Sequence, residues 1–251
     1  MWTRVELKDR AKQVLKNSYW KALLASFIIL IAVGSSGSPG FSWNFGGRSG
    51  SGNTSLYGTD TKFLVLVAGL LLVIVAIIFI AALAFRIFIG FPLEVGGRRY
   101  FIKAAENRVN LNEVGFAFKK GIYIEIVKAM AWRALFNILW FLLFLIPGIV
   151  KAYAYSMVPY ILADNPEIGY DRALKLSMDM TYGEKGNIFV LDLSFLGWYL
   201  LGLCACFIGA FFLLPYINAT KAELYLTLRK NAIEANITSY EELRINPIVN
   251  Y

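Results

Sequence analysis

The chain has 251 residues, of which 58% are hydrophobic and 17% are charged, and its formal net charge is +8. Soluble domains are typically about half apolar and about a quarter charged, so this composition argues against an ordinary soluble domain. Histidine is absent, which excludes Ser-His-Asp and Cys-His catalysis and histidine-ligated metals. The two cysteines, Cys204 and Cys206, point to different faces of a helix and suit neither a disulfide nor a metal pair. We expect no cofactor.

Residues 3–17 predict an amphipathic helix that begins with Thr3 and Glu6 at the spacing of a capping box. One face of this helix is mostly apolar, and a ridge of lysines runs beside it. The apolar stripe consists of Leu7, Ala11, Val14, Leu15 and Ser18. Such a helix suits an anionic membrane surface, and a solvated lead-in to the first membrane span is the alternative.

The first two membrane spans are expected at residues 19–33 and 63–89, separated by a loop rich in Gly, Ser and Asn at 34–60. Residues 63–85 carry no charge and exceed the roughly 20 apolar residues that cross a bilayer. The loop cannot bury enough apolar surface to become ordered, so it predicts a flexible external segment. The polar stretch 91–121 predicts a cytoplasmic loop.

Four further spans and a second surface helix are expected in the rest of the chain. The spans lie at 122–146, 149–163, 187–204 and 205–228, and the surface helix at 170–182. In that surface helix Ala173, Leu176 and Met180 share one side, at the spacing of an amphipathic helix. Residues 231–251 form a polar tail after a single transmembrane domain, 1–230.

The basic residues predict the topology. With a cytoplasmic N-terminus, nineteen lysines and arginines fall in cytoplasmic segments and two, Arg48 and Lys62, in the external loop. The positive-inside rule therefore favours both termini in the cytoplasm, which requires an even number of spans. The positive-inside rule also accounts for the positive net charge, so we expect no nucleic acid as a partner. The predicted fold is all-α, a polytopic transmembrane helix bundle of about six spans with amphipathic surface helices.

Several short strings, taken in order, resemble a family of integral membrane proteins. They are Leu7–Lys12 with Tyr19-Trp20, Phe91–Gly96 with Arg99–Phe101, Ile146–Ile149 with Lys151–Tyr153 and Tyr155–Met157, Asn165-Pro166, Ser177-Met178 with Gly183 and Lys185, Leu193–Trp198, and Pro215-Tyr216 with Thr220, Ala222 and Tyr225. The pattern resembles the family called domain of unknown function 975. The resemblance implies a six-span protein of the bacterial plasma membrane and carries no catalytic residues. The family is also distantly similar to the membrane domain of some glycerophosphodiester phosphodiesterases.

An ionisable residue inside a predicted span costs about 3 kcal/mol on insertion scales, so five of them are candidates for function. They are Glu125, Lys128, Arg133, Lys151 and Asp192. Glu125 and Lys128 have the spacing of a local pair near a helix end, and Lys151 is expected to reach the head groups. Arg133 falls near the middle of its span, where its side chain could meet Asp192. Two interpretations stay open, an ion pair that fixes helix packing and a polar lining for a solute or a lipid head group.

Three residues are expected to break or bend helices. Pro147 and Gly148 are expected to end one span, and Pro215 interrupts another. The carbonyl that a proline frees can instead bind a cation in transporters. Asn218 and Thr220, one turn after Pro215, could satisfy the freed backbone groups.

The sequence favours a non-enzymatic membrane protein that handles an amphiphile, a peptide or a small solute, or that serves as a subunit beside a transporter. Its expected partners are membrane lipids and either another membrane protein or a second copy of the chain. A structural or scaffolding membrane protein is the first alternative. An intramembrane lipid-modifying enzyme is the second, and only Glu125, Asp192 and Ser194 could act in it.

Overall fold

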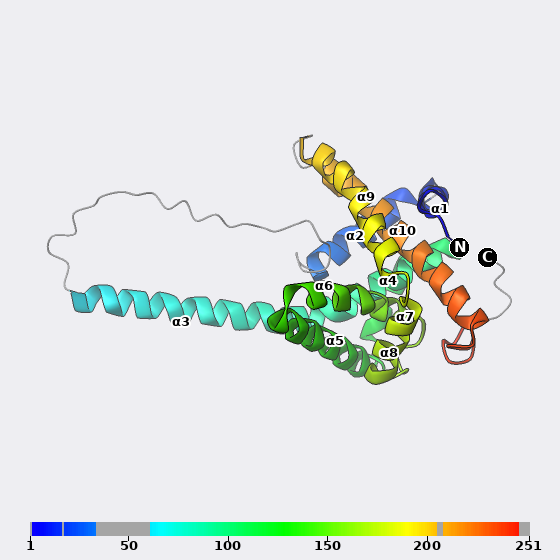
Figure 1. Cartoon of the computed structure of the whole chain (residues 1–251). Coiled ribbons are helices and arrows are strands. Elements are labelled where there is room, and N and C mark those ends of the chain that lie inside the picture. Colours follow the sequence, from blue (N-terminus) through cyan, green and yellow to red (C-terminus); the bar gives the residue numbers. More distant parts are fainter. Residues whose placement is uncertain (1, 17, 34–60, 205–207, 246–251) are drawn as a thin grey trace.

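A long helix projects from a cluster of shorter helices in the computed structural model (Figure 1). The structure describes residues 2–16, 18–33, 61–204 and 208–245, and within these ranges every regular element is a helix. The all-α prediction is therefore confirmed for the described part of the chain. The predicted loop 34–60 lies outside it.

The projecting helix continues directly into the body of the molecule. α3 (Thr61–Phe85) passes through a single π-helical turn, η2 (Arg86–Gly90), into α4 (Phe91–Ala105). The polar stretch 91–121, expected as a cytoplasmic connection between two spans, is therefore helical in its first half. Most α4 side chains are buried, including Glu94 and Arg98, because its charged residues find partners inside the body. An eight-residue 3₁₀ helix, η3 (Leu111–Phe118), follows α4.

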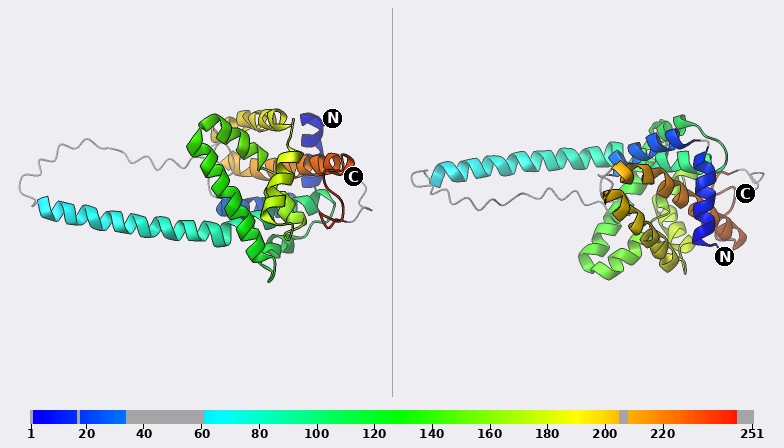
Figure 2. Two further views of the ribbon diagram at one scale, coloured as in Figure 1. Left: turned by 60° about the horizontal axis from the view of Figure 1, so that its bottom comes forward. Right: turned by 90° about the horizontal axis from the view of Figure 1, so that it is seen from above.

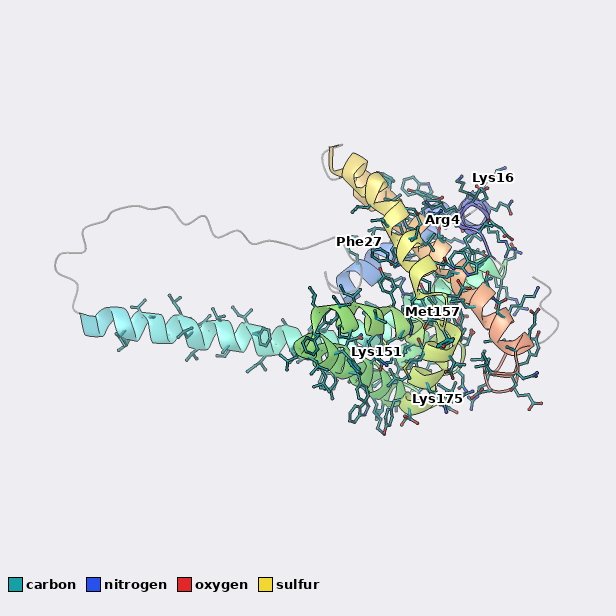
Figure 3. All side chains as sticks on the ribbon, in the orientation of Figure 1. Arg4, Lys16, Phe27, Lys151, Met157 and Lys175 are labelled. Atoms are coloured by element: carbon teal, nitrogen blue, oxygen red, sulfur yellow. The ribbon has the colours of Figure 1, made fainter. Side chains whose placement is uncertain are left out.

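α3 is exposed on every side, and Figure 3 shows its side chains extending away from the axis with no other element alongside. Fourteen of its fifteen large apolar side chains between Val65 and Phe85 are 42–71% exposed. Exposing a large apolar side chain to water costs about 1.5 kcal/mol or more, so this helix would cost on the order of 20 kcal/mol in water. That exceeds the net stability of a typical domain, about 5–15 kcal/mol. α3 therefore requires an apolar surrounding.

α4 is the central helix of the body, and α2, α5, α7, α10 and η3 all pack against it. Figure 2 shows these helices gathered at one end of α3 in two further views. In chain order the remaining helices are α1 (Arg4–Lys16), α2 (Tyr19–Val33), α5 (Tyr123–Leu143), α6 (Leu145–Ala154), α7 (Val158–Asp164), α8 (Tyr170–Met180), α9 (Lys185–Cys204) and α10 (Ile208–Glu234).

Two adjacent glycines let neighbouring elements approach α4 closely. A Cβ atom on Gly96 would lie 1.9 Å from the carbonyl oxygen of Val114, and one on Gly97 would lie 2.2 Å from Cγ1 of Ile29. Any side chain at these positions would push η3 or α2 away. The glycine pair thus serves helix packing, although the sequence alone suggested a loop.

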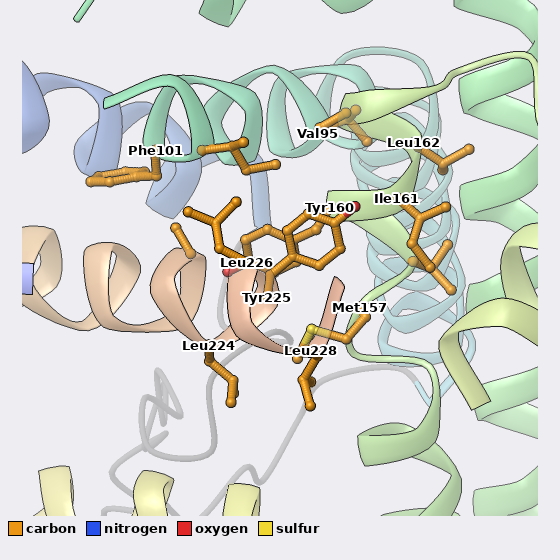
Figure 4. Close-up of a cluster of buried hydrophobic side chains, with 14 of the residues drawn as sticks. Val95, Phe101, Met157, Tyr160, Ile161, Leu162, Leu224, Tyr225, Leu226 and Leu228 are labelled. Atoms are coloured by element: carbon orange, nitrogen blue, oxygen red, sulfur yellow. The ribbon is translucent and has the colours of Figure 1, made fainter. Parts of the chain in front are cut away.

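The apolar core lies where α4, α7 and α10 meet, as Figure 4 shows. Val95 and Phe101 from α4 face Ile161 from α7 and Leu226 from α10 across this core. Tyr160 of α7 and the α10 residue Tyr225 stack with ring centroids 5.3 Å apart.

Within the described residues, three helical stretches are long and apolar enough to span a membrane. They are Val65–Ala105, Tyr123–Leu143 and Leu145–Asp164. The last of these breaks between α6 and α7, and half of its most apolar window is buried in the protein. The structure thus supports a membrane protein, but six spans are not confirmed.

The two predicted surface helices pack their apolar faces against the body. Leu7, Ala11 and Leu15 of α1 are buried, and α1 lies on α10. The expectation that this stripe rests on a membrane surface is therefore wrong. The start of the helix is as predicted, because the Thr3 hydroxyl accepts a hydrogen bond from the Glu6 backbone N–H. In α8 the predicted stripe of Ala173, Leu176 and Met180 is likewise buried.

Candidate functional site

A buried carboxylate on α4, Glu94, is surrounded by arginines from three elements. The Glu94 side chain is 4% exposed and pairs with Arg133 of α5 at 3.4 Å and with Arg86 of η2 at 3.5 Å. Arg98, one turn along α4, acts on Glu94 electrostatically. The i,i+4 spacing of Glu94 and Arg98 places both on the face of α4 that turns inward.

Arg98 extends this cluster into the core. Its guanidinium donates to Oδ1 of Asn218 on α10 at 2.7 Å and lies 5.2 Å from the ring centroid of Tyr160. The Asn218 amide donates in turn to the hydroxyl of Ser26 on α2 at 3.1 Å. A continuous polar seam therefore joins α2, α10, α4 and α5, and it fixes how these helices pack.

We call Arg86, Glu94, Arg98 and Arg133 the arginine cluster. Its three guanidiniums lie around one carboxylate, that of Glu94. Arg86 and Arg133 repel each other electrostatically. The Nε–H groups of Arg98 and Arg133 are buried without a hydrogen-bond partner. A buried charge without compensation is costly, so this arrangement suits an anionic group arriving from outside the protein.

The cluster lies at one end of the apolar helix. Arg86 directly follows α3, and its side chain is 25% exposed, while that of Arg133 is 19% exposed. Both guanidiniums can therefore be reached from the surface where α3 enters the body. Arginines at the end of a membrane-spanning helix commonly reach the level of the lipid head groups.

The expected contact between Arg133 and Asp192 is not formed. Arg133 pairs with Glu94, whereas Asp192 on α9 pairs with Lys221 of α10 at 3.2 Å and accepts a hydrogen bond from the Tyr153 hydroxyl at 3.4 Å. The prediction was wrong because α4, assigned to a loop, supplies a nearer carboxylate. Both residues do lie in buried or half-buried polar contacts, as the cost of charges inside a span requires.

The other expected pair is confirmed. Glu125 and Lys128 lie 4.0 Å apart in the first turns of α5, with half-exposed side chains. Lys151 lies 5.0 Å from the ring centroid of Trp140.

The three residues considered for catalysis do not converge. Ser194 donates to the Leu191 carbonyl oxygen and accepts a hydrogen bond from Lys8 at 2.9 Å. Burial and the neighbouring cations Arg4 and Lys12 lower the pKa of Lys8. Asp192 and Glu125 have separate partners, described above. In the described ranges, no group of three or more acidic or cysteine side chains is placed to hold a metal ion.

None of the three residues expected to break or bend a helix, Pro147, Gly148 and Pro215, lies at a helix end. The chain turns at Phe144, which has an extended conformation between α5 and α6, whereas Pro147 and Gly148 lie in the first turn of α6. A Cβ atom on Gly148 would lie 2.7 Å from the ring of Phe141, so this glycine allows the two helices of the hairpin to approach. α10 continues through Pro215.

The two residues expected to compensate for Pro215 also have other partners. Asn218 binds Arg98 and Ser26, as described above. The Thr220 hydroxyl donates to the carbonyl oxygen of Tyr216, which is not the carbonyl that the proline frees.

Sequence reasoning missed Glu94 and Arg98. A signal was present, because apolar residues such as Val95 and Ile102 alternate with the charges of this stretch and the glycine pair could have been taken for a packing site. Because this stretch contains many charged residues, it was interpreted as a connecting segment instead.

One comparison with known proteins gives a result. Residues 124–232 match the model of a family described as Protein of unknown function (DUF975). This segment of the chain is similar to DUF975. It contains Arg133, Asp192, Asn218 and Lys221, whereas Arg86, Glu94 and Arg98 precede it.

The DUF975 match confirms the resemblance noted from the sequence over that segment, while the similarity to glycerophosphodiester phosphodiesterases stays a prediction. No curated protein and no solved structure matches the chain.

Proposed function

We propose that this protein is an integral membrane protein of the plasma membrane that binds an anionic amphiphile without catalysing its conversion. The observation that carries the proposal is the excess of arginine around Glu94 at the end of α3. The bound group would be the phosphate of a lipid head group, and α3 would pass through the hydrocarbon layer.

The length of α3 supports its position across the hydrocarbon layer. Val65–Phe85 contains 21 residues, which at 1.5 Å per residue extend about 31 Å. The hydrocarbon core of a bilayer is about 30 Å thick. With α3 across the bilayer, Arg86 lies at the level of the phosphates on the side of the body.

The hairpin of α5 and α6 fits the same placement. Residues on both sides of its turn, from Leu142 to Ile146, are 60–82% exposed and apolar. In Figures 1 and 2 this turn lies on the side of the body from which α3 projects. It would enter the same membrane face beside the arginine cluster.

Guanidinium groups suit a phosphate ligand. Arginine offers several donors in a planar fork that matches two phosphate oxygens, and it keeps its charge when half-buried. A lipid phosphodiester, which carries one negative charge, would add a second anionic group beside Glu94. Arg86 and Arg133, the more exposed members, would make first contact.

The orientation is part of the proposal. α1 and the C-terminal end of α10 lie on the side of the body away from α3 in Figure 1. The positive-inside count from the sequence supports a cytoplasmic position for this side. The arginine cluster would then face the cytoplasmic leaflet, which is rich in anionic lipid.

The experiment measures lipid retained by the protein after purification in mild detergent. Native mass spectrometry of the wild-type protein is expected to show bound phospholipid. The double variant Arg86→Gln with Arg133→Gln is expected to retain at least fivefold less, because both exposed guanidiniums are gone. Lys128→Gln, a control on the same helix α5, is expected to retain the wild-type amount. Equal retention by the wild-type protein and the double variant would refute the proposal.

A scaffolding role is the second candidate, favoured by α3 itself. α3 packs mainly against η2, and its large apolar side chains are mostly exposed, so its apolar surface is available to lipid, to another membrane protein or to a second copy of the chain. Crosslinking from a cysteine introduced at Gly69, where a Cβ atom meets no other atom within 4 Å, would test this role. A specific crosslinked protein in membranes would support scaffolding, and its absence would leave lipid as the surrounding of α3.

A further inference from the structure

A second site lies between α1 and α10, at a distance in the fold from the arginine cluster. A cavity of about 300 Å³ opens between these two helices. This volume is at the lower end of the range for pockets that hold small organic ligands, about 300–1,000 Å³. In Figure 1 these helices meet on the side of the body opposite to α3.

The feature that makes this cavity a site is Glu223 of α10. This residue lines the cavity and is only 6% exposed. Among the residues that the structure describes, its carboxylate has neither an ion-pair partner nor a hydrogen-bond donor, since only its backbone carbonyl accepts a bond, from Thr227. A buried carboxylate without a partner costs several kcal/mol. A cation in the cavity would remove that cost.

The other charges of the lining compensate each other. Glu6 pairs with Arg10 at 2.5 Å, and Glu234 pairs with Lys230 at 4.0 Å. Both pairs are exposed at the edge of the cavity, with side chains about half exposed or more. Glu223 is therefore the one negative charge in excess among the lining residues, so the complementary ligand carries a single positive charge.

The apolar part of the lining and the size of the cavity indicate an organic ligand. Leu7, Leu226 and Trp2 contribute to the wall, and an indole face attracts a cationic group. A bare alkali-metal ion would fill little of 300 Å³ and would have a single protein carboxylate to replace its hydration shell. An ammonium group on a short hydrocarbon body can satisfy both the carboxylate and the apolar wall.

We propose that the cavity between α1 and α10 binds a small organic monocation, an amine, through an ion pair with Glu223. The amine nitrogen contacts the Glu223 carboxylate, and its hydrocarbon part packs against Leu7, Leu226 and Trp2. The binding energy comes from compensating a buried charge and from burying apolar surface. Occupation would also hold α1 against α10. The inference is independent of phosphate binding at the arginine cluster.

Isothermal titration calorimetry of the full chain in detergent tests the proposal with n-hexylamine and its neutral counterpart n-hexanol. Hexylamine is expected to bind saturably at pH 7 and at least tenfold more tightly than hexanol. Glu223→Gln keeps the size of the side chain but removes its charge, and it is expected to weaken hexylamine binding at least tenfold. Glu241→Gln, the same substitution at an exposed position outside the cavity, is the matched control and is expected to bind as the wild-type protein does.

A second variant keeps the test decisive if Glu223→Gln does not fold. Arg10 acts on Glu223 electrostatically, and it also compensates Glu6. Arg10→Gln is therefore expected to tighten hexylamine binding about threefold or more, because a competing positive charge is removed. Equal affinity for hexylamine and hexanol, or unchanged affinity in both variants, would overturn the proposal.

Discussion

The two buried ion clusters attached to α4 differ in how their charges balance. Near the C-terminal end of α4, Arg229 of α10 pairs with Asp164 at 2.7 Å and with Glu106 at 3.1 Å. Tyr225 donates to Asp164 at 2.8 Å, and Lys103 pairs with Glu106 at 2.8 Å. Two positive and two negative groups are thus joined in one network. At the other end, the arginine cluster has three positive groups around Glu94.

This difference indicates two roles. The Arg229 network is closed to solvent, since the side chains of Arg229, Asp164 and Glu106 are 1–3% exposed, and its charges compensate each other inside the protein. Such a network fixes the arrangement of α4, α7 and α10. The arginine cluster reaches the surface through Arg86 and Arg133, so an anionic group from outside the chain can approach its guanidiniums. A buried ion cluster with equal numbers of positive and negative groups therefore indicates a structural role. A cluster in which arginines outnumber carboxylates indicates a binding site.

The largest effect is expected from Arg229→Met, which breaks the balanced network. Asp164 and Glu106 would both lose a buried counter-charge, so the free energy of unfolding is expected to fall by about 3–5 kcal/mol. Thermal and denaturant unfolding of the purified protein measure it. Arg244→Met, in the exposed pair with Glu167, is the control and is expected to change stability by less than about 1 kcal/mol. A small loss for Arg229→Met would contradict the structural role.

Glu94→Gln is expected to have the next largest effect, because it removes the one carboxylate of the arginine cluster. Three guanidiniums would then lie together, at a cost of about 1–3 kcal/mol. Added phosphatidylglycerol is expected to restore part of the unfolding temperature, whereas the neutral lipid diacylglycerol is not. The same loss with and without anionic lipid would show that the cluster does not bind a phosphate.

A double-mutant cycle would check how Asp192 relates to the arginine cluster. Arg133→Gln and Asp192→Asn have no shared ion-pair partner, so their effects on the free energy of unfolding are expected to add within about 0.5 kcal/mol. Asp192→Asn and Lys221→Gln remove the two partners of one pair, and a coupling of about 0.5–3 kcal/mol is expected. Strong coupling between Arg133 and Asp192 would show instead that these two charges act together.

The smallest effect concerns a half-exposed pair, Arg172 of α8 with Glu242, at 2.6 Å. The hydrogen bond from Arg172, with a second from Thr238, holds the pKa of Glu242 below its ordinary value. A lowered carboxylate pKa stabilises the folded state above the unfolded pKa, about 4.3. That stabilisation is lost as the pH falls through the lower folded pKa.

Hydrogen exchange of residues 237–245 measures this contribution. Protection is expected to be constant from pH 7 to about 5 after correction for intrinsic exchange, and to fall below about pH 4. Because the pair is half exposed, the change is expected to stay below about 1 kcal/mol. Arg172→Gln should lower the protection at pH 7 and remove most of this pH dependence. A loss of protection above pH 5 would contradict the assignment to Glu242.

Much of the local structure could be predicted, because it depends on residues close together in the chain. The uncharged run 63–85 required a helix in an apolar surrounding. The spacing of Thr3 and Glu6 marked the start of α1, and the i,i+3 spacing of Glu125 and Lys128 gave their pair. These interactions lie within one helix, where sequence separation fixes distance.

The candidate site could be predicted only in part. Arg133 was identified because a charge inside an apolar segment is costly wherever that segment packs. Its partner was not, because Glu94 is 39 residues away and becomes its neighbour only when α4 packs against α5. The glycine pair at 96 and 97 was misjudged for the same reason, since its role depends on Val114 and Ile29.

The sequence by itself determined an all-helical chain with an apolar segment that water cannot surround, and it marked the isolated charges that need partners. Tertiary structure alone decided which partner each charge obtained. The physical reason is that hydropathy and helical periodicity are properties of consecutive residues, whereas the charge balance of a buried site is the sum over side chains from distant segments. Among the partners described above, positive and negative groups are equal in number around Arg229, whereas arginines outnumber carboxylates around Glu94, and the function proposed here follows from the difference.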